Sequence, residues 1–553
     1  MAVSDDLVTM ADIARLAEVT LPAVSNWRRR HETFPRSERR NGQELFVTAE
    51  VAHWLDSREV AKGDLKASEL SGITYGDRFR RNKFRVVTGS QARFKESLWK
   101  ELSRFRGAED IAAYADLVLG LLYLSVQKRD KWVDIAAAGV WESGQLVEIA
   151  ILETLEHRPL LLRLHRALSS FRGESRGVER LGEVIRVLDQ VQRMADSEMD
   201  RSLWGGEVFE YLLNRFAAVE GKRGLVVTPP SVIRLLVELI ALKPGESVLD
   251  PCSGSGGFLV EAAKYIEEHG GRASDVVFFG QAILERSWAF TRMNLDLHRV
   301  RADLAARPGI ALHDDLHSGR RFDAILVNPP FNMSDWRSGQ PTDRCCRYGS
   351  PPKSNANFAW LQHIWSSLAE GGRAAVVMAN NALSSEHAGE GRIRAAMVED
   401  GVVEALIALP PQLFSTTAIP VTVWLLRRPG NMRDDEVLFV DARMLGSMIS
   451  RTQRDLLPDD NRRIVDTVLK WRDRQQQRYQ NIHGFSASAA IQAIREHEYQ
   501  LTPGRYVGTE IRTGMSANSV IELRYELDRL HLRAMEVDAI ADQQLSRITA
   551  WNP

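Results

Sequence analysis

Residues 247–258, Ser-Val-Leu-Asp-Pro-Cys-Ser-Gly-Ser-Gly-Gly-Phe, run from a short apolar strand through an aspartate into a glycine-rich turn. The apolar positions of residues 259–268 recur at helical spacing, which predicts a helix directly after the turn. In open α/β sheets, ligands bind at the carboxyl ends of the strands, where Asp250 stands. Glycine permits a tight turn and a close approach of the backbone to a ligand. The stretch therefore predicts an α/β fold with a ligand site at a strand end.

The region around this turn alternates short apolar segments with helical patterns. The segments that fit buried strands are residues 247–249, 276–279, 324–327, 374–378, 405–409 and 421–426. Strands interleaved with helices predict a doubly wound sheet. We therefore place an α/β domain at residues 218–430.

The 553-residue chain is too long for one ordinary hydrophobic core. Helical and hairpin patterns divide the remainder into four parts. They are a winged helix-turn-helix-like unit (1–60), a helical domain (61–217), a mixed C-terminal extension (431–515) and a C-terminal amphipathic helix (516–553). The last helix needs an apolar partner, which is either its own chain or another subunit.

Composition and charge bear on which classes of protein this chain can belong to. The chain is 44% hydrophobic and 26% charged, and no apolar run reaches the roughly 20 residues of a membrane span. The N-terminus lacks the apolar core of a signal peptide, so we expect a cytoplasmic protein. The three cysteines are too few for a disulfide framework, and the 13 histidines show no ligand spacing. We therefore expect neither a disulfide framework nor a metal site. With a net charge of −1, any basic DNA-binding surface must be local or belong to a partner subunit.

The first 60 residues carry the signals of two short helices. Thr9 and Asp12 form a capping-box pattern before a helix at residues 10–17. Thr20 is placed to cap a second helix at residues 21–30.

The second helix has the pattern of a DNA-recognition helix, because Val24 and Trp27 stand at core spacing and polar residues fill the other positions. The candidate DNA contacts are Ser25, Asn26, Arg28 and Arg29. Asn41-Gly42 then predicts a hairpin turn, which would form a wing, and a closing helix follows at residues 49–55. The arrangement resembles excisionase-type and MerR-type winged helix-turn-helix modules. The alternative is a plain helical cap with solvated arginines.

A second strand-end motif, Asn328-Pro329-Pro330-Phe331, follows the predicted strand at residues 324–327. The N6 lone pair of adenine is delocalised into the ring and is a poor nucleophile. The Asn328 side-chain oxygen and the Pro329 carbonyl could accept both N6 hydrogens and localise this lone pair. The prolines fix the backbone, and Phe331 offers a face on which a flipped base can stack. These residues predict methylation of an exocyclic amine.

The glycine-rich turn fits the methyl donor of such a reaction. It lacks the Gly-x-Gly-x-x-Gly register and the lysine of a P-loop, so a pyrophosphate is not its expected ligand. A nucleoside that carries an amino acid fits better. Alone, the turn is compatible with a simple strand-to-helix connection, and an isolated Asn-Pro-Pro-Phe with a loop. Both motifs in this order within one α/β domain favour a methyltransferase.

Together, the motifs resemble those of the γ-type N6-adenine DNA methyltransferases, and more closely the modification subunit of type I restriction-modification systems. The resemblance spans about residues 202–507 and includes Thr228-Pro229, residues 331–336, residues 409–414 with Ile419-Pro420, and residues 499–506. It implies a Rossmann-like methyltransferase domain that uses S-adenosyl-L-methionine and acts on double-stranded DNA. It also implies a separate specificity subunit and, in a complete system, a restriction subunit with nuclease and translocase activity.

The resemblance assigns residues to two halves of one site. The target base would be held by Asn328, Pro329, Pro330 and Phe331. The cofactor would be held by Thr228, Pro229, Asp250, Gly254, Gly256 and Asp314.

One position departs from the family pattern. Where the family usually shows Gly-Gln-Glu, with a carboxylate for the cofactor ribose, this chain has Gly280-Gln281-Ala282. Glu285, about one helical turn further on, is the candidate substitute. Val227 also stands where an aromatic residue often precedes Thr-Pro. We therefore expect weakened cofactor affinity.

Two other functions stay open on this sequence. One is methylation of protein glutamine or of RNA, because an amide amine can use the same Asn-Pro-Pro geometry. The other is a DNA-binding or assembly protein that has lost catalysis, which Ala282 keeps open.

Overall fold

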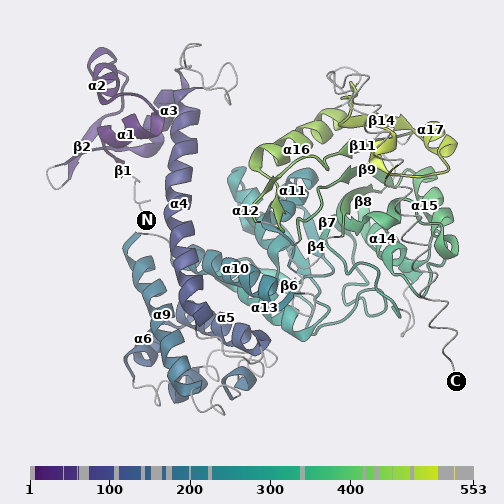
Figure 1. The fold of residues 1–553 in the computed structure, drawn as a ribbon, viewed down its shortest axis with the longest axis horizontal. Coiled ribbons are helices and arrows are strands. Elements are labelled where there is room, and N and C mark those ends of the chain that lie inside the picture. The colour runs from purple at the N-terminus through teal and green to yellow at the C-terminus, as the bar shows by residue number, and fades with distance from the viewer. Residues whose placement is uncertain are drawn as a thin grey trace. The chain divides into compact units, whose positions relative to one another are not determined.

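The computed structural model describes residues 7–40, 43–58, 60, 74–104, 111–138, 144–150, 165–169, 177–198, 201–221, 227–336, 343–414, 419–428, 435–450, 452–473, 479–508 and 529. The chain forms two compact units, Met1–Glu220 and Gly221–Pro553 (Figure 1). The predicted turn Asn41-Gly42 lies outside the described residues, as does the predicted C-terminal helix apart from Arg529. The five-part division of the chain therefore stays a prediction.

The first unit begins with three helices and a small antiparallel sheet of order β1-β3-β2 (Figure 1). The helices are α1 (Met10–Ala17), α2 (Leu21–Arg30) and α3 (Thr48–Asp56), and the strands are β1 (Leu7–Val8), β2 (Ser37–Arg40) and β3 (Gln43–Val47). The predicted caps are confirmed. The Asp12 backbone N–H donates to Thr9 Oγ1 at 3.1 Å, and the Ala23 N–H donates to Thr20 Oγ1 at 3.3 Å. Val24 and Phe46 are fully buried in the core beneath.

Longer helices make up the rest of this unit. They are α4 (Tyr75–Arg104), α5 (Ile111–Gln127), α6 (Arg129–Ala137), α9 (Gly177–Glu198) and α10 (Arg201–Glu220). The start of α4 completes the core of the N-terminal helices, because Phe79 is fully buried among them. Within the described residues, no single helix has the length and apolarity to cross a membrane; the pair α5 and α6 reaches them only across a 119° bend.

The second unit is built on a nine-stranded sheet of order β14-β11-β9-β10-β8-β7-β4-β5-β6. Its strands are β4 (Ser247–Asp250), β5 (Val277–Gly280), β6 (Ala302–Leu304), β7 (Phe322–Val327), β8 (Leu368–Ala379), β9 (Val403–Ala408), β10 (Val421–Arg427), β11 (Glu436–Asp441) and β14 (Ser486–Ala490). Neighbouring strands from β8 through β7 and β4 to β6 are parallel, whereas β10 is antiparallel to both of its neighbours. All six predicted strands are present.

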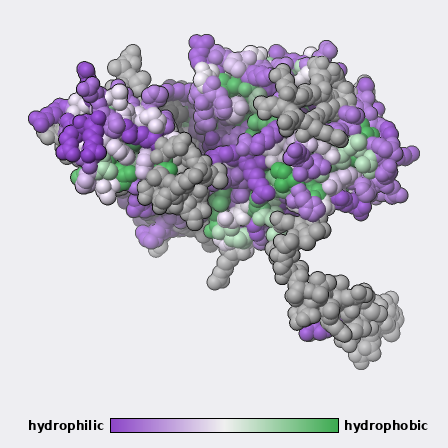
Figure 2. All heavy atoms as spheres, turned by 90° about the horizontal axis from the view of Figure 1, so that it is seen from above, coloured by the Kyte–Doolittle hydropathy of each residue, from purple (hydrophilic) through white to green (hydrophobic). Residues whose placement is uncertain are grey.

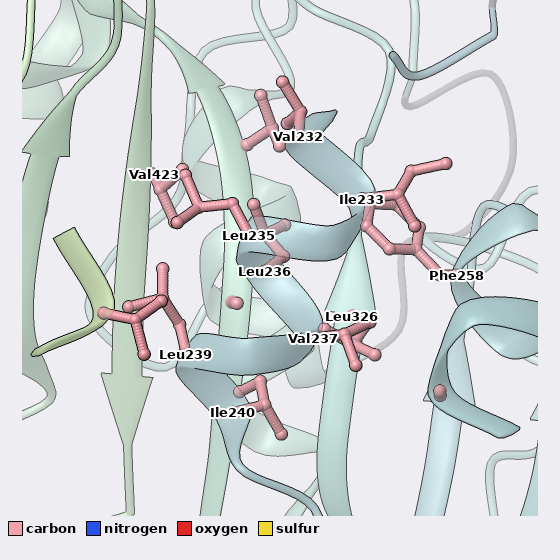
Figure 3. Close-up of a cluster of buried hydrophobic side chains, with 14 of the residues drawn as sticks. Val232, Ile233, Leu235, Leu236, Val237, Leu239, Ile240, Phe258, Leu326 and Val423 are labelled. Atoms are coloured by element: carbon pink, nitrogen blue, oxygen red, sulfur yellow. The ribbon is translucent and has the colours of Figure 1, made fainter. Parts of the chain in front are cut away.

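Helices cover both faces of this sheet (Figure 1). On one face lie α11 (Pro230–Ile240), α12 (Gly257–Glu268), α13 (Glu285–Leu297) and α16 (Pro458–Arg472); the other face has α14 (Asn357–Ser366), α15 (Glu390–Glu399) and α17 (Ile491–Glu496). Successive strand residues point to opposite faces. Val423 therefore joins the core under α11, shown in Figure 3, whereas Trp424 joins the opposite core. The predicted doubly wound α/β fold is confirmed.

The sheet continues past residue 430, where we placed the end of the α/β domain. β11 pairs in parallel with β9, and β14 pairs with β11. β14 reads Ser-Ala-Ser-Ala-Ala, without the β-branched and aromatic residues that predict strands, so it is a strand because of its neighbour. Residues 310–312, which look strand-like in sequence, form a turn region instead, and the edge strand is β6.

Candidate active site

The glycine-rich loop joins β4 to α12 at the carboxyl edge of the sheet. Asp250 ends the strand and is 2% exposed, and its Oδ1 accepts the Cys252 backbone N–H at 3.0 Å. Gly256 precedes α12 with φ of +77°, a conformation that favours glycine. A Cβ at Gly256 would stand 3.1 Å from Cγ2 of Thr291, so the loop also needs the small residue.

A cavity of about 580 Å³ opens beside this loop, within the second unit. It lies between the ends of β4 and β7, with the start of α11 and α12 on its wall. The predicted site residues that line it are Thr228, Asp250, Gly254, Asn328, Pro329, Pro330 and Phe331. The structure thus brings members of both predicted halves to one cavity, of a size that suits a small-molecule ligand.

Asn328 holds a defined orientation in this cavity. Its Nδ2 donates to Thr228 Oγ1 at 2.9 Å. Its Oδ1 is buried and has no hydrogen-bond partner among the described residues. Buried polar atoms are almost always satisfied, and an unmade hydrogen bond costs about 1–3 kcal/mol. Because Asn328 lines the cavity, this acceptor is open to a donor from a ligand.

A cluster of asparagines fixes the loop that follows Phe331. Asn332 has φ of +52°, and its backbone N–H donates to Oδ1 of the buried Asn357 at 3.0 Å. Its Oδ1 accepts from Nδ2 of Asn357 at 3.0 Å and from Nδ2 of Asn381 at 2.9 Å. Trp336, 1% exposed, anchors the end of the loop by donating from Nε1 to the Pro352 carbonyl at 2.8 Å. These contacts make Phe331 part of a rigid edge.

An aromatic pair forms one side of the cavity. The rings of Phe331 and Phe414 lie 6.2 Å apart at 78°, edge to face. Phe414 comes from the predicted motif at residues 409–414, so two motifs distant in sequence meet here. A half-buried aromatic face beside a buried acceptor can take a flat, hydrogen-bonding ring.

Four predicted cofactor residues do not line the cavity: Pro229, Gly256, Glu285 and Asp314. The Pro229 carbonyl accepts the first backbone hydrogen bonds of α11, which places Thr228 at the cavity wall. Glu285 is the first residue of α13. The Asp314 carboxylate forms an ion pair with Arg307, and its backbone carbonyl accepts from Nε2 of Gln281 at 2.7 Å. Any cofactor role of these four residues stays a prediction.

Several lining residues were not among the predicted site residues. They are Ile233, Cys252, Ser253, Ser255, Gly257, Phe258, Ile283, Leu284, Ser287, Met333, Phe414 and Ile419. Most have ordinary apolar or hydroxyl side chains whose chemistry does not signal a site. Their one available signal was position, because most stand within a few residues of a predicted strand end. Among the described residues, no three His, Cys, Asp or Glu side chains are grouped so as to hold a metal ion.

The chain matches a known protein family. The model of the N-6 DNA methylases matches residues 202–513, which is more than half of the chain. The chain belongs to this family. As an N-6 DNA methylase, it is an adenine-specific DNA methyltransferase. The match begins inside α10 and continues past β14, so it includes the whole sheet.

Relatives of this methylase carry type I names. The HindI methylase subunit of a type I restriction enzyme from Haemophilus influenzae is 40% identical over 55% of this chain and 68% of its own length. The MjaIX methylase subunit from Methanocaldococcus jannaschii is 37% identical over 55% of this chain, which spans 56% of that protein. A crystal structure of the type I methyltransferase subunit from Streptococcus thermophilus superposes with a TM-score of 0.60 at 22% identity, over 75% of this chain and 99% of that one. That likeness supports the fold.

Proposed function

We propose that this methylase is the modification subunit of a restriction-modification or phage-defence system. It transfers the methyl group of S-adenosyl-L-methionine to N6 of an adenine flipped out of duplex DNA. The observation that carries this proposal is the buried, unpartnered Oδ1 of Asn328 beside Phe331 in the cavity. An N6 amine is a donor that suits this acceptor.

The residues of the first half of the cavity fit S-adenosyl-L-methionine. The cofactor supplies a methyl group on a cationic sulfonium, and its amino acid carries an ammonium group. Thr228, Asp250 and Gly254 face the cavity, and the buried Asp250 carboxyl gives that end an acidic group suited to a cation. Gly256 does not line the cavity, but its left-handed backbone conformation allows the turn. Glu285 and Asp314 remain candidates for the ribose and adenine ends, and Ala282, 2% exposed, supplies no carboxylate there.

The second half orients the base. The Asn328 Oδ1 and the Pro329 carbonyl accept the two N6 hydrogens, which localises the nitrogen lone pair. Pro330 restricts the backbone at this point, and Phe331 stacks on the adenine ring. Thr228 holds the Asn328 amide so that its oxygen cannot turn away from the base. No residue has to remove a proton before the attack, because the nitrogen becomes cationic as its bond to the methyl carbon forms and the sulfur–methyl bond breaks, and one N6 proton then passes to solvent.

Sequence recognition requires a partner in this proposal. The relatives are named as subunits of type I restriction enzymes, and the net charge of this chain is only −1. We infer that a separate specificity subunit selects the DNA site and contacts the predicted C-terminal amphipathic helix at residues 516–553. A restriction subunit with nuclease and translocase activity would join the same assembly.

Transfer of a labelled methyl group tests the proposal. The chain, together with its proposed specificity subunit, is incubated with labelled S-adenosyl-L-methionine and unmethylated DNA. We expect label on the DNA, recovered as N6-methyladenine. Label on protein or RNA would contradict the proposed substrate. Cofactor binding without label on any acceptor would show a methylase that has lost catalysis.

The buried carboxyl of Asp250 predicts that cofactor affinity depends on pH. Burial raises the pKa of Asp250 to about 7, although the hydrogen bond from Cys252 opposes this rise. Below pH 7 the carboxyl is neutral and loses its attraction for the cofactor ammonium, whereas above pH 7 it is charged. Cofactor affinity should therefore be full above about pH 7 and fall as the pH drops, approaching tenfold per pH unit. Calorimetry across about pH 5.5 to 8.5 measures this profile.

Two variants control that measurement. Asp250→Asn should bind the cofactor more weakly at high pH and lose the pH dependence. Asp314→Asn should keep the dependence, because the Arg307 guanidinium holds the pKa of Asp314 below its usual range. An unchanged profile in Asp250→Asn would remove Asp250 from the proposed site.

A further inference from the structure

The N-terminal helices present a polar surface that the methylation site does not use. On α2, Val24 is buried and Trp27 packs against Trp54 and Tyr75, so both face inward. Ser25, Arg28, Arg29 and Arg30 of the same helix are exposed. The N-terminal unit shows a largely hydrophilic surface in Figure 2. The helices α1 to α3 and their small sheet precede residue 202, where the family match begins.

One ion pair ties α2 to the β2–β3 hairpin. Nη1 and Nη2 of Arg28 donate to the two carboxylate oxygens of Glu44 on β3 at 2.7 and 2.6 Å. Ser37 on β2 donates its hydroxyl to the same carboxylate at 2.6 Å. The pair is accessible, with 41% of the Arg28 side chain and 29% of the Glu44 side chain exposed. The helix and the hairpin therefore form one continuous surface.

The charge on this surface is unevenly compensated. Arg28 has Glu44 as its partner, but Nη2 of Arg29 donates to the neutral Oδ1 of Asn26 at 2.6 Å. Arg30, Arg36 and Arg39 are also exposed on α2, the loop after it and β2. A phosphate that approaches Arg28 must compete with Glu44 for the N–H groups at the edge of the guanidinium.

We infer that α2 and the β2–β3 hairpin form a second duplex-DNA-binding surface, in which Glu44 occupies Arg28 until a DNA phosphate displaces it. This goes beyond the proposed function, because it assigns a DNA contact outside the methyltransferase domain. A helix and a hairpin side by side suit the major groove and the adjoining backbone of a duplex. Apart from Leu21, the described residues of this surface expose no large apolar side chain, so it suits a polyanion better than an apolar protein partner.

Variants of this surface should change the affinity for DNA in opposite directions. We expect Glu44→Gln to tighten binding of the full-length chain to a labelled duplex several-fold, because it frees Arg28 and removes a competing charge. Arg29→Gln with Arg30→Gln should weaken binding several-fold. It should also lower the slope of log affinity against log salt by about 2, because each arginine neutralises one phosphate. Fluorescence anisotropy between about 50 and 200 mM salt measures both effects.

A matched ion pair elsewhere in the same unit serves as the control. Glu183 and Arg186 on α9 also form a two-pronged, exposed pair. Glu183→Gln should leave DNA affinity unchanged, and so should Arg186→Gln. If Glu44→Gln behaves like Glu183→Gln and the double arginine variant binds as the parent does, the unit is a helical cap. Equal competition by single-stranded RNA would contradict a duplex-specific surface. The assay needs no methyl transfer, so its result is independent of the proposed catalysis.

Discussion

Replacing Asn328 with alanine should lower methyl transfer by on the order of 10³-fold while cofactor affinity stays nearly unchanged. The Asn328 Oδ1 is the buried acceptor that the base requires, and loss of one such preorganised group costs about 10²–10³ in rate. The proline-rich backbone and the Phe331 face remain in the variant, so DNA binding should persist. Single-turnover transfer of a labelled methyl group, with calorimetric titration of the cofactor, separates the two effects.

Two further variants sharpen this result. Asn328→Asp keeps an oxygen acceptor and should retain part of the rate, because the Thr228 hydroxyl, which accepts from the Asn328 amide, can donate to a carboxylate in its place. Asn461→Ala removes another nearly buried asparagine, 4% exposed, whose Nδ2 donates to the Ser231 carbonyl at 2.9 Å and whose Oδ1 also lacks a partner among the described residues, but which does not line the cavity. This control should keep the catalytic rate of the folded protein. Full activity in Asn328→Ala would overturn the assignment of the base-holding site.

Loss of the Glu404 carboxylate should destabilise the second unit by about 3–5 kcal/mol, because it leaves a buried arginine without its counter-charge. Oε1 of Glu404 on β9 accepts from Nε of Arg472 on α16 at 2.8 Å, and Oε2 accepts from Nη2 at 2.7 Å. Both side chains are largely buried, at 5% and 14% exposure. Glu404→Ala should therefore lower the Tm of this unit, measured by calorimetry on the full chain.

A second ion pair on α16 gives the contrast. Nη1 of Arg462 lies 3.1 Å from Oδ1 of Asp459, and both side chains are strongly exposed. Arg462→Ala should therefore change the free energy of unfolding by less than about 1 kcal/mol. Joint replacement of Glu404 and Arg472 with methionine should recover much of the loss, since no unpaired charge stays buried. Equal Tm values for Glu404→Ala and Arg462→Ala would show that water reaches Arg472 and solvates its charge.

Local patterns predicted most of the secondary structure of the sheet domain. The six apolar segments form strands because each is long enough, and apolar enough, to be buried on both faces. The caps at Thr9 and Thr20 are equally local, since each depends on residues at most three positions away. β6, β11 and β14 were missed. The strand state of β6 and β14 comes from pairing with β5 and β11, which no local window contains, whereas β11 itself has an apolar, strand-like sequence.

Some residues of the candidate site could be predicted from local sequence, and others could not. The sequence motifs identified Asn328, Phe331 and Asp250, because their chemistry follows from residue type and position at a strand end. The partners of these residues could not be found locally: Thr228 lies 100 positions from Asn328. The same holds for Phe414, which closes the aromatic side of the cavity from a distant strand end.

The α/β class and the order of the two motifs followed from the sequence, and the chemistry at Asn328 is predicted from it, because each depends on neighbouring residues. Only the tertiary structure decided that Asn328 Oδ1 has no partner among the described residues and that Glu44 is paired with Arg28. It also decided that Asp314 points its carboxylate to Arg307. Whether a polar atom is free or satisfied depends on what long-range packing brings within hydrogen-bond distance, which the spacing of residues along the chain does not specify.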